Sequence, residues 1–188
     1  MPTVTRDGRA SGTLRLLEQH HPDGADEAAQ LRQMTQLLAS TPEPFSREQF
    51  DPGHFTASAL VVSPSARLVL LIAHPTLGLW LQPGGHIEPG DPSPLDAAFR
   101  EVMEETGLAP RLEPILFDVD VHDIPARKAD PAHRHFDLRF LALVEGVPVP
   151  ASAEGLESRW LHIAEAARLT TDASVRRMLD KARAQGLL

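Results

Sequence analysis

The feature that most constrains the fold is a short amphipathic segment between Pro94 and Gly107, which follows a glycine-rich turn and ends in three glutamates. Ser93 is a typical N-cap and proline suits the first helical position, so a helix is predicted to begin at Pro94. Glycine is a typical helix stop, so the helix is predicted to end at Gly107. Apolar residues three and four positions apart predict one buried stripe. The stripe comprises Leu95, Ala98, Phe99, Val102 and Met103. Such a helix has to pack against another layer of the domain.

The charged residues of this helix are predicted on the face opposite the stripe. At about 100° per residue they span an arc of roughly 140°. They are Arg100, Glu101, Glu104 and Glu105. Carboxylates near a helix C-terminus oppose the helix dipole, and like charges three or four residues apart repel by about 0.2–0.5 kcal/mol per pair. We therefore expect a cation beside them; a solvated face partly neutralised by Arg100 is the alternative.

A glycine turn lies directly upstream of the helix. Gly84 and Gly85 allow backbone groups to approach an ion or a phosphate closely. Mg²⁺ takes about six oxygen ligands at roughly 2.1 Å and keeps some of its waters. Three carboxylates, one carbonyl, waters and a substrate phosphate can supply that shell. The turn therefore favours a metal site over a merely solvated face.

Together these residues resemble the signature box of the Nudix hydrolase superfamily. The box consists of glycine, five residues, glutamate, seven residues, and then Arg-Glu-apolar-x-Glu-Glu-x-Gly-apolar. Here Gly85 begins it, and residues 100–108 match the second half without a gap. Two features depart from the pattern, because Asp91 replaces the glutamate and eight residues separate it from Arg100. The extra residue lies at the helix entrance, so either Asp91 or Asp96 could orient Arg100.

The resemblance implies a metal-dependent hydrolase that cleaves a diphosphate linkage in a nucleoside diphosphate derivative by water attack at phosphorus. It implies Mg²⁺ or Mn²⁺ as cofactor and Arg100 as an orienting residue. The implied metal ligands are Glu101, Glu104, Glu105 and the carbonyl of Gly85. The candidates for general base, which the sequence does not rank, are Glu88, Asp137, Glu154 and Glu157.

Two other functions remain open. A binding or regulatory module could keep the fold without the activity, but the retained Arg100 and its three glutamates argue against it. Some relatives are isomerases of diphosphate esters. Those resemble one another in using a cysteine for proton transfer, and this chain has none.

A second group of polar residues alternates along a predicted strand and its hairpin partner, and alternation directs side chains to one surface. The group is His122, His133, His135 and Asp137. It could contact phosphate, a base or another metal, or it could be a hydrogen-bonded polar face. His86, in the glycine turn, could meet the phosphates. Trp80 could stack on a base or belong to the core.

Six short apolar runs predict strands. They are residues 57–62, 67–72, 80–82, 115–121, 135–144 and 159–163. The first two form a predicted hairpin, and the third is predicted to be broken at residues 83–85. Residues 163–184 are predicted to be helical with a break near 170–172, where an N-cap could start the second piece. The pattern favours an α+β fold, an α/β/α sandwich with a mixed sheet.

The first part of the chain is predicted to be an N-terminal helical extension, residues 1–54, ahead of a Nudix domain at 55–188. Apolar residues recur at helical spacing within 14–20 and 28–38. No chemistry is evident in this extension. It either packs on the main body or forms a homodimer contact.

Composition restricts the partners. The chain of 188 residues with 42% hydrophobic residues suits one domain, and the absence of cysteine excludes disulfides and thiolate sites and fits a reducing compartment. A net charge of −8 argues against duplex nucleic acid but allows a nucleotide-like small molecule, because a bound divalent ion reverses the local field. No membrane-length apolar run or secretory signal is evident, so we expect a cytoplasmic protein.

Overall fold

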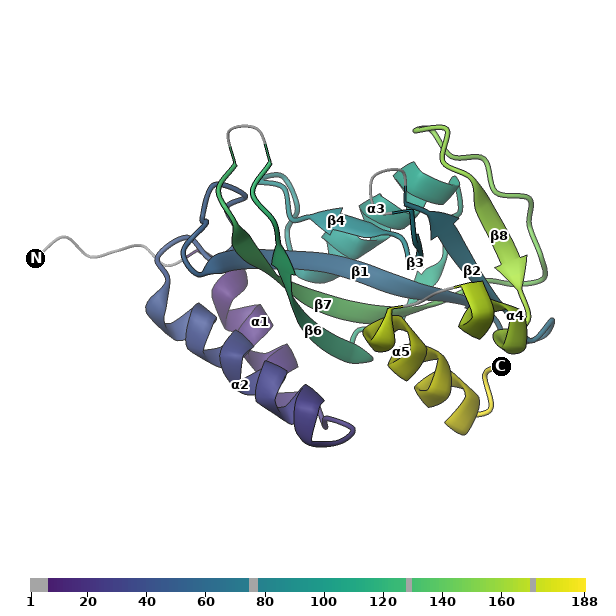
Figure 1. Ribbon diagram of the computed structural model, residues 1–188, viewed down its shortest axis with the longest axis horizontal. Helices are drawn as coiled ribbons and strands as arrows, with labels where there is room; N and C mark the ends of the chain where they lie inside the picture. The colour runs from purple at the N-terminus through teal and green to yellow at the C-terminus, as the bar shows by residue number, and fades with distance from the viewer. Residues whose placement is uncertain (1–6, 75–77, 128–129, 170–171) are drawn as a thin grey trace, which may run out of the picture.

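The computed structural model describes residues 7–74, 78–127, 130–169 and 172–188, with a mixed sheet at its centre (Figure 1). The strands are β1 (Gly53–Ser63), β2 (Leu68–Ala73), β3 (Trp80–Leu81), β4 (Gly84–His86), β5 (Arg111–Leu112), β6 (Asp118–Ile124), β7 (His133–Leu143) and β8 (Ser158–Leu161). Their main order is β3-β2-β1-β7-β5, while β4, β6 and β8 pair with β1, β7 and β2. The long central pair β1–β7 is parallel and the other pairs are antiparallel. The predicted mixed sheet is confirmed.

Helices cover both faces of this sheet. They are α1 (Arg9–Gln19), α2 (Ala25–Ser40), α3 (Pro94–Thr106), α4 (Ile163–Leu169) and α5 (Ala173–Ala184). Because side chains alternate along β1, Phe55 and Ala57 enter one apolar cluster with residues of α1, α2 and α3. Leu60 and Val62 enter a second cluster with residues of α4 and α5. The α/β/α sandwich is therefore confirmed, and no helix in the described part of the chain has the length and apolar character needed to cross a bilayer.

The predicted strands exist, but several of their bounds are wrong, including the start of the central strand β1 at Gly53 rather than at residue 57. The β1–β2 hairpin pairs as predicted, with Val61 opposite Leu70. Residues 83–85 were predicted to break the third strand; the break lies at residues 82–83, and residues 84–86 form a separate strand, β4, which pairs with β1. The reason lies at Gly84, where a β-carbon would come within 2.2 Å of the Ser58 β-carbon, so only glycine permits this pairing. Strand β5 was not predicted, and β6 begins at Asp118 rather than at residue 115.

Helix α3 has the predicted ends but a different buried face. The Ser93 hydroxyl accepts the Asp96 N–H at 3.2 Å, and Gly107 ends the helix in the left-handed conformation with φ 70°. The buried apolar positions are Ala97, Ala98 and Val102. The prediction was wrong for Phe99 and Met103, which are 37% and 42% exposed. Small alanines let the helix lie close to the sheet, and this orientation buries Glu105 rather than the larger apolar residues.

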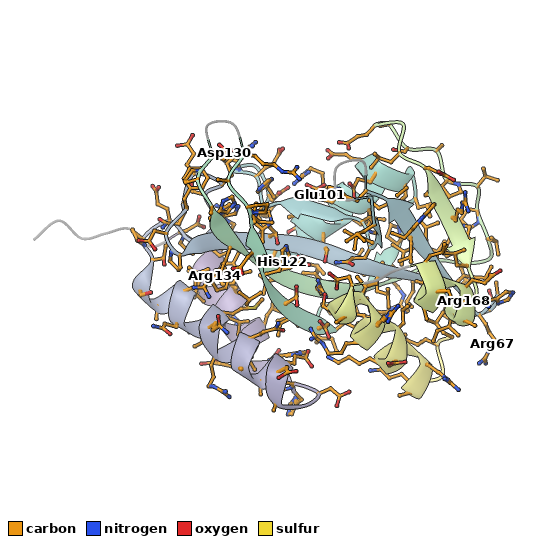
Figure 2. All side chains as sticks on the ribbon, in the orientation of Figure 1. Arg67, Glu101, His122, Asp130, Arg134 and Arg168 are labelled. Atoms are coloured by element: carbon orange, nitrogen blue, oxygen red, sulfur yellow. The ribbon has the colours of Figure 1, made fainter. Side chains whose placement is uncertain are left out.

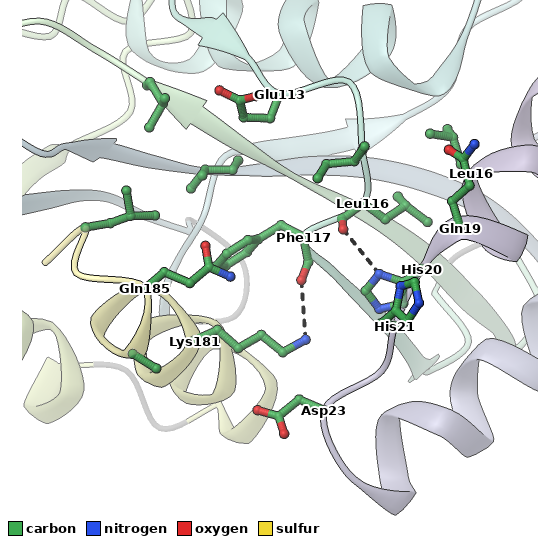
Figure 3. A pocket seen from close by; sticks show the side chains of 15 residues that line it. Leu16, Gln19, His20, His21, Asp23, Glu113, Leu116, Phe117, Lys181 and Gln185 are labelled. Atoms are coloured by element: carbon green, nitrogen blue, oxygen red, sulfur yellow. Dashed lines mark hydrogen bonds between the residues drawn. The ribbon is translucent and has the colours of Figure 1, made fainter.

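The N-terminal helices pack on the main body, where they meet α5 through buried charges. Lys181 of α5 lies 2.6 Å from Glu27 Oε2 of α2 and 2.8 Å from Asp118 Oδ2 of β6. His20 Nε2 lies 2.8 Å from Glu27 Oε1, and burial of Glu27 is outweighed by these hydrogen bonds, so its pKa falls to about 2. A cavity of about 600 Å³ opens beside Lys181, between α1 and α5 (Figure 3).

The predicted break in the C-terminal helical segment separates α4 from α5. Asp172 is the N-cap of α5, and its carboxylate accepts the N–H groups of Ser174 and Val175. The other two residues of the predicted break, 170 and 171, lie outside the described residues.

Candidate functional site

Two of the three glutamates of α3, Glu101 and Glu105, contact strand β4, and Glu104 lies beside them on Arg100. Figure 2 shows Glu101 in this region. The N–H of Gly84 donates to Glu105 Oε2 at 2.8 Å. A β-carbon at Gly85 would lie 2.7 Å from Glu101 Oε1, so glycine is needed for the carboxylate to lie where it does. The glycine turn and the helix thus form one acidic pocket, as the sequence predicts.

Arg100 connects the two halves of the motif. Its Nε and Nη2 donate to the two Asp91 oxygens at 3.1 and 2.9 Å, and Nη2 also donates to the carbonyl of His86 at 2.9 Å. Its Nη1 donates to Glu101 and Glu104, both at 2.9 Å. Asp91, rather than Asp96, is therefore the carboxylate that orients Arg100. The Asp96 side chain instead accepts the hydroxyl of Ser93 at 2.6 Å.

The electrostatics of the acidic pocket favour a cation. Burial raises the pKa of Glu105 to about 8 against the hydrogen bond from Gly84, and the charges of Glu101, Glu154 and Glu104 raise it further. Burial also raises the pKa of Glu101, despite the opposing hydrogen bond from Arg100. Carboxylates held together with raised pKa values gain most from a divalent ion, which offsets both desolvation and mutual repulsion. An all-oxygen donor set of this kind fits Mg²⁺ or Mn²⁺.

The loop that follows β7 satisfies the C-terminal carbonyls of α3. Ala153 donates its N–H to the Glu104 carbonyl at 3.0 Å, and Ala151 donates to Thr106 at 2.8 Å. The same loop carries Glu154, whose charge reaches Glu101 and Glu105. It therefore places one of the four candidate bases beside the acidic pocket.

The other candidate bases differ in their surroundings. Asp137 is buried and accepts hydrogen bonds from Thr56, Ser58 and Arg139, so both of its oxygens are engaged. Glu157 pairs with Arg159 at 2.6 Å. The remaining candidate, Glu88, lines the cavity beside Glu101.

That cavity, of about 880 Å³, extends from Gly85 and Glu101 to the N-terminal segment. Arg9, Phe45 and Arg47 form part of its wall, and the Arg9 guanidinium lies 4.7 Å from the centre of the Phe45 ring. Sequence reasoning missed this contribution, because nothing in the local pattern around Phe45 shows which part of the domain it faces.

Comparison with known proteins decides the family. The model of the NUDIX domain matches residues 52–182, which is more than half of the chain. The chain belongs to the Nudix family. With the acidic helix intact, it is a Nudix-type pyrophosphohydrolase, as predicted.

Individual Nudix relatives agree with the match. A probable DHNTP pyrophosphohydrolase of Lactococcus lactis subsp. cremoris is 36% identical over 124 residues, which cover 64% of this chain and 72% of the relative. The structure resembles the E. coli dihydroneopterin triphosphate pyrophosphohydrolase with TM-score 0.58, 22% identity and coverage of 68% and 92%. The NUDIX domain of Shewanella oneidensis NrtR, complexed with ADP ribose, gives TM-score 0.54, 21% identity and coverage of 80% and 97%. The two structural likenesses show the fold.

The predicted polar residues of β6 and β7 separate into two environments in this Nudix domain. Asp137 belongs to a buried ion network with Arg139 and Asp120, and Arg139 donates to both carboxylates. His133 and His135 instead meet His54 of β1, whose ring centre lies 5.2 and 4.9 Å from theirs. Sequence reasoning missed His54, because the predicted strand began at residue 57 and the parallel pairing of β1 with β7 was unknown.

The histidine group extends across four strands of the Nudix domain. His122 lies opposite His135 in the β6–β7 ladder, and Figure 2 shows His122 on β6. His86 of β4 lies with its ring centre 5.2 Å from both His54 and His135. Burial lowers the pKa of His86 to about 4 and also lowers the pKa of His54 and His135, so these imidazoles are neutral at pH 7.

Trp80 lies apart from this group. It is partly buried beside the α4–α5 cluster, and the Arg159 guanidinium lies 4.9 Å from the centre of its ring. The structure therefore gives Trp80 a packing partner, as one of the two sequence interpretations expected.

Proposed function

We propose that this Nudix protein hydrolyses the diphosphate linkage of a nucleotide-like triphosphate, with a pteridine triphosphate as the first substrate to test. The observation that carries the proposal is the joining of the acidic pocket to the large cavity walled by Arg9, Phe45 and Arg47. The Lactococcus relative, named as a probable DHNTP pyrophosphohydrolase, supports the choice of substrate.

We propose Glu101, Glu104, Glu105 and the Gly85 carbonyl as the groups that hold Mg²⁺ or Mn²⁺. Dependence on divalent metal is typical of the family. When bound, such an ion neutralises phosphate charge and lowers the pKa of a coordinated water. The raised pKa values of Glu101 and Glu105 support this assignment. Among the described residues Arg100 pairs with Glu101, whereas Glu105 accepts only the N–H of Gly84 and has no cationic partner.

Arg100 positions the glutamates in this proposal. Asp91 holds two of its nitrogens, which leaves Nη1 to orient Glu101 and Glu104. Glu154 is the base that we favour, since its charge acts on the pocket and its loop is anchored to the end of α3. Its carboxylate would accept a proton from the attacking water.

The cavity wall suggests how the rest of the substrate is held. Arg9 is fixed by Asp7 at 2.6 Å and by the Glu88 carbonyl at 2.9 Å, so its guanidinium is held in place in the cavity wall, with its charge partly offset by Asp7. The Phe45 ring is 2% exposed and packs against Phe55 and the Arg9 guanidinium, so it supports Arg9 from within the core. Arg47, which is exposed in the cavity wall, adds a positive group for phosphate. A triphosphate matches the positive groups of this wall, and the printed name of the Lactococcus relative supports a pteridine as its ring.

The test is a substrate panel with Mg²⁺ or Mn²⁺, in which phosphorus NMR identifies the products. The panel contains dihydroneopterin triphosphate, nucleotide sugars, dinucleotide cofactors, dinucleoside polyphosphates and oxidised nucleoside triphosphates. Glu104→Gln and Glu105→Gln should each lower turnover by on the order of 100-fold, while Glu18→Gln, an exposed substitution on α1, should leave it unchanged. Full turnover in both variants of the acidic pocket would refute the site, and binding without turnover in the wild type would support a regulatory module.

A further inference from the structure

We propose that His54, His133 and His135 form a second metal site, which binds a borderline transition metal ion such as Zn²⁺. Their candidate ligand atoms all lie within 4.8 Å of one another. The site lies on the sheet face opposite α3, because His54 and His135 alternate with Phe55 and Phe136, which pack in the cluster of α3. The proposal is therefore separate from the glutamate pocket.

The spacing of the imidazole nitrogens suits a shared ion. His133 Nε2 and His135 Nε2 lie 3.3 Å apart. Zinc–nitrogen bonds of about 2.0–2.1 Å at a tetrahedral angle require about 3.3–3.4 Å between two ligand nitrogens. This pair already has the required separation, and His54, whose ligand atom lies within 4.8 Å of theirs, has to move closer for three imidazoles to share one ion.

Backbone carbonyls orient two of the rings toward a common point. His54 Nδ1 donates to the Gln49 carbonyl at 3.1 Å, and His133 Nδ1 donates to the Pro131 carbonyl at 2.8 Å. Each of these bonds places the ring proton on Nδ1, so that Nε2 carries a lone pair. At His133 this lone pair accepts the Nε2–H of His135, a bond that a metal ion would replace. A carbonyl bound to Nδ1 is the supporting arrangement that metal-binding histidines use.

His54 supplies an independent observation. Its side chain is buried, with 1% of the residue exposed, and its Nε2 has no hydrogen-bond partner within the described ranges. Buried ring nitrogens are nearly always satisfied, so an unpaired one that faces two other imidazoles indicates a ligand between them. A merely structural polar face would not require this nitrogen to be left unpaired.

The chemistry of the donors identifies the ion. Neutral imidazole suits Zn²⁺, Co²⁺, Ni²⁺ and Cu²⁺, whereas Mg²⁺ prefers oxygen ligands. The histidine site and the acidic pocket would therefore take different metals from the same solution. A cavity of about 220 Å³ beside His133 and His135 provides an entry path, and His86, Arg127 and Asp130 form part of its wall.

The experiment measures metal content and affinity rather than activity. The full-length protein is loaded with Zn²⁺ in excess Mg²⁺, desalted and assayed for metal by mass spectrometry, and the Zn²⁺ affinity is measured by competition with a chromogenic chelator. We expect one retained zinc per chain. His133→Gln and His135→Gln should each weaken Zn²⁺ binding by at least about tenfold, a loss seen even when a supporting partner of a ligand is removed.

Matched variants distinguish zinc held by the three histidines from zinc held at the glutamate pocket or by exposed histidines. His162→Gln changes an exposed histidine outside the cluster and should retain zinc, and Glu104→Gln should retain it even though turnover is lost. His54→Gln would test the third ligand, but it changes a fully buried residue and could prevent folding. His133 is only partly buried, so His133→Gln is expected to fold in either case. Absence of zinc from the desalted wild type, or unchanged affinity in both β7 variants, would overturn the proposal without affecting the proposed hydrolase function.

Discussion

The Glu101 carboxylate lies so close to Gly85 that a β-carbon at position 85 would be 2.7 Å from Glu101 Oε1. The contact joins strand β4 to helix α3 at the point where both halves of the Nudix box meet. The atom that would have to move is the end of a flexible side chain, so the backbone can stay in place. The glycine therefore matters for where the carboxylate lies more than for whether the chain folds.

Gly85→Ala should accordingly lower turnover by on the order of 100-fold, because displacement of a site group by about 1 Å can have that effect. The melting temperature should change little. Gly90→Ala is the matched control, since a β-carbon there meets no heavy atom within 4 Å. Equal activity in the two variants would show that the position of Glu101 is unimportant.

Asp91→Asn should weaken the two charge-assisted bonds that orient Arg100 and lower kcat by about 10- to 100-fold. Asp96→Asn is the comparison, because Asp96 contacts Ser93 and an amide oxygen can still accept that hydroxyl. Steady-state kinetics of both variants at saturating Mg²⁺ would show which of the two carboxylates orients Arg100. A larger loss in the Asp96 variant would contradict the assigned partner.

The pKa of Glu105 predicts how pH affects the metal-free protein. Its folded-state pKa of about 8 lies above the unfolded value of 4.5, so the folded state holds a proton that the unfolded state has lost between those pH values. The resulting contribution to stability is complete below pH 4.5 and is lost as pH rises through about 8. Chemical denaturation in EDTA should show a steeper fall in the free energy of unfolding for wild type than for Glu105→Gln.

Divalent metal should reverse this dependence, because metal binding requires the deprotonated carboxylate. The increase in melting temperature produced by Mn²⁺ should be larger at about pH 8.5 than at about pH 6. An increase that is independent of pH, or larger at the lower pH, would count against Glu105 as a ligand.

Lys181→Met should lower the free energy of unfolding by about 3–5 kcal/mol, because it leaves the buried carboxylates of Glu27 and Asp118 without this cation. Arg183→Met removes an exposed charge from the same helix and should change stability by no more than about 0.5 kcal/mol. Urea denaturation of both variants checks the difference. A near-neutral Lys181→Met would mean that water or Arg177 compensates for the missing charge.

Local rules were sufficient for the part of the fold that carries the acidic residues. Ser93, Pro94 and Gly107 are each specified by helix-end chemistry, and the structure places α3 between them. Which face of α3 is buried could not be predicted from the residues of the helix alone. It depends on Ala97 and Ala98 packing on the sheet, which is why Phe99 was wrongly predicted to be buried.

Long-range pairing accounts for what the sequence could not provide. His54 and His135 are neighbours only because β1 and β7 run parallel, and Phe45 reaches the cavity only because the N-terminal segment folds back over β4. Neither the pairing of β1 with β7 nor the position of Phe45 produces a periodic pattern in the sequence. The acidic pocket, by contrast, is built from residues close together in the chain, so its spacing alone indicated it.

Asp91 still reaches Arg100 although the interval between them is one residue longer than in the family pattern. The added length is absorbed at residues 92–93, before the helix begins. A search that demands a constant interval between the two halves would pass over chains of this kind. Because α3 tolerates an inserted residue at its start, the spacing between the two halves is a poor criterion for homologues. The contacts of Arg100 with Asp91, Glu101 and Glu104 are a better one.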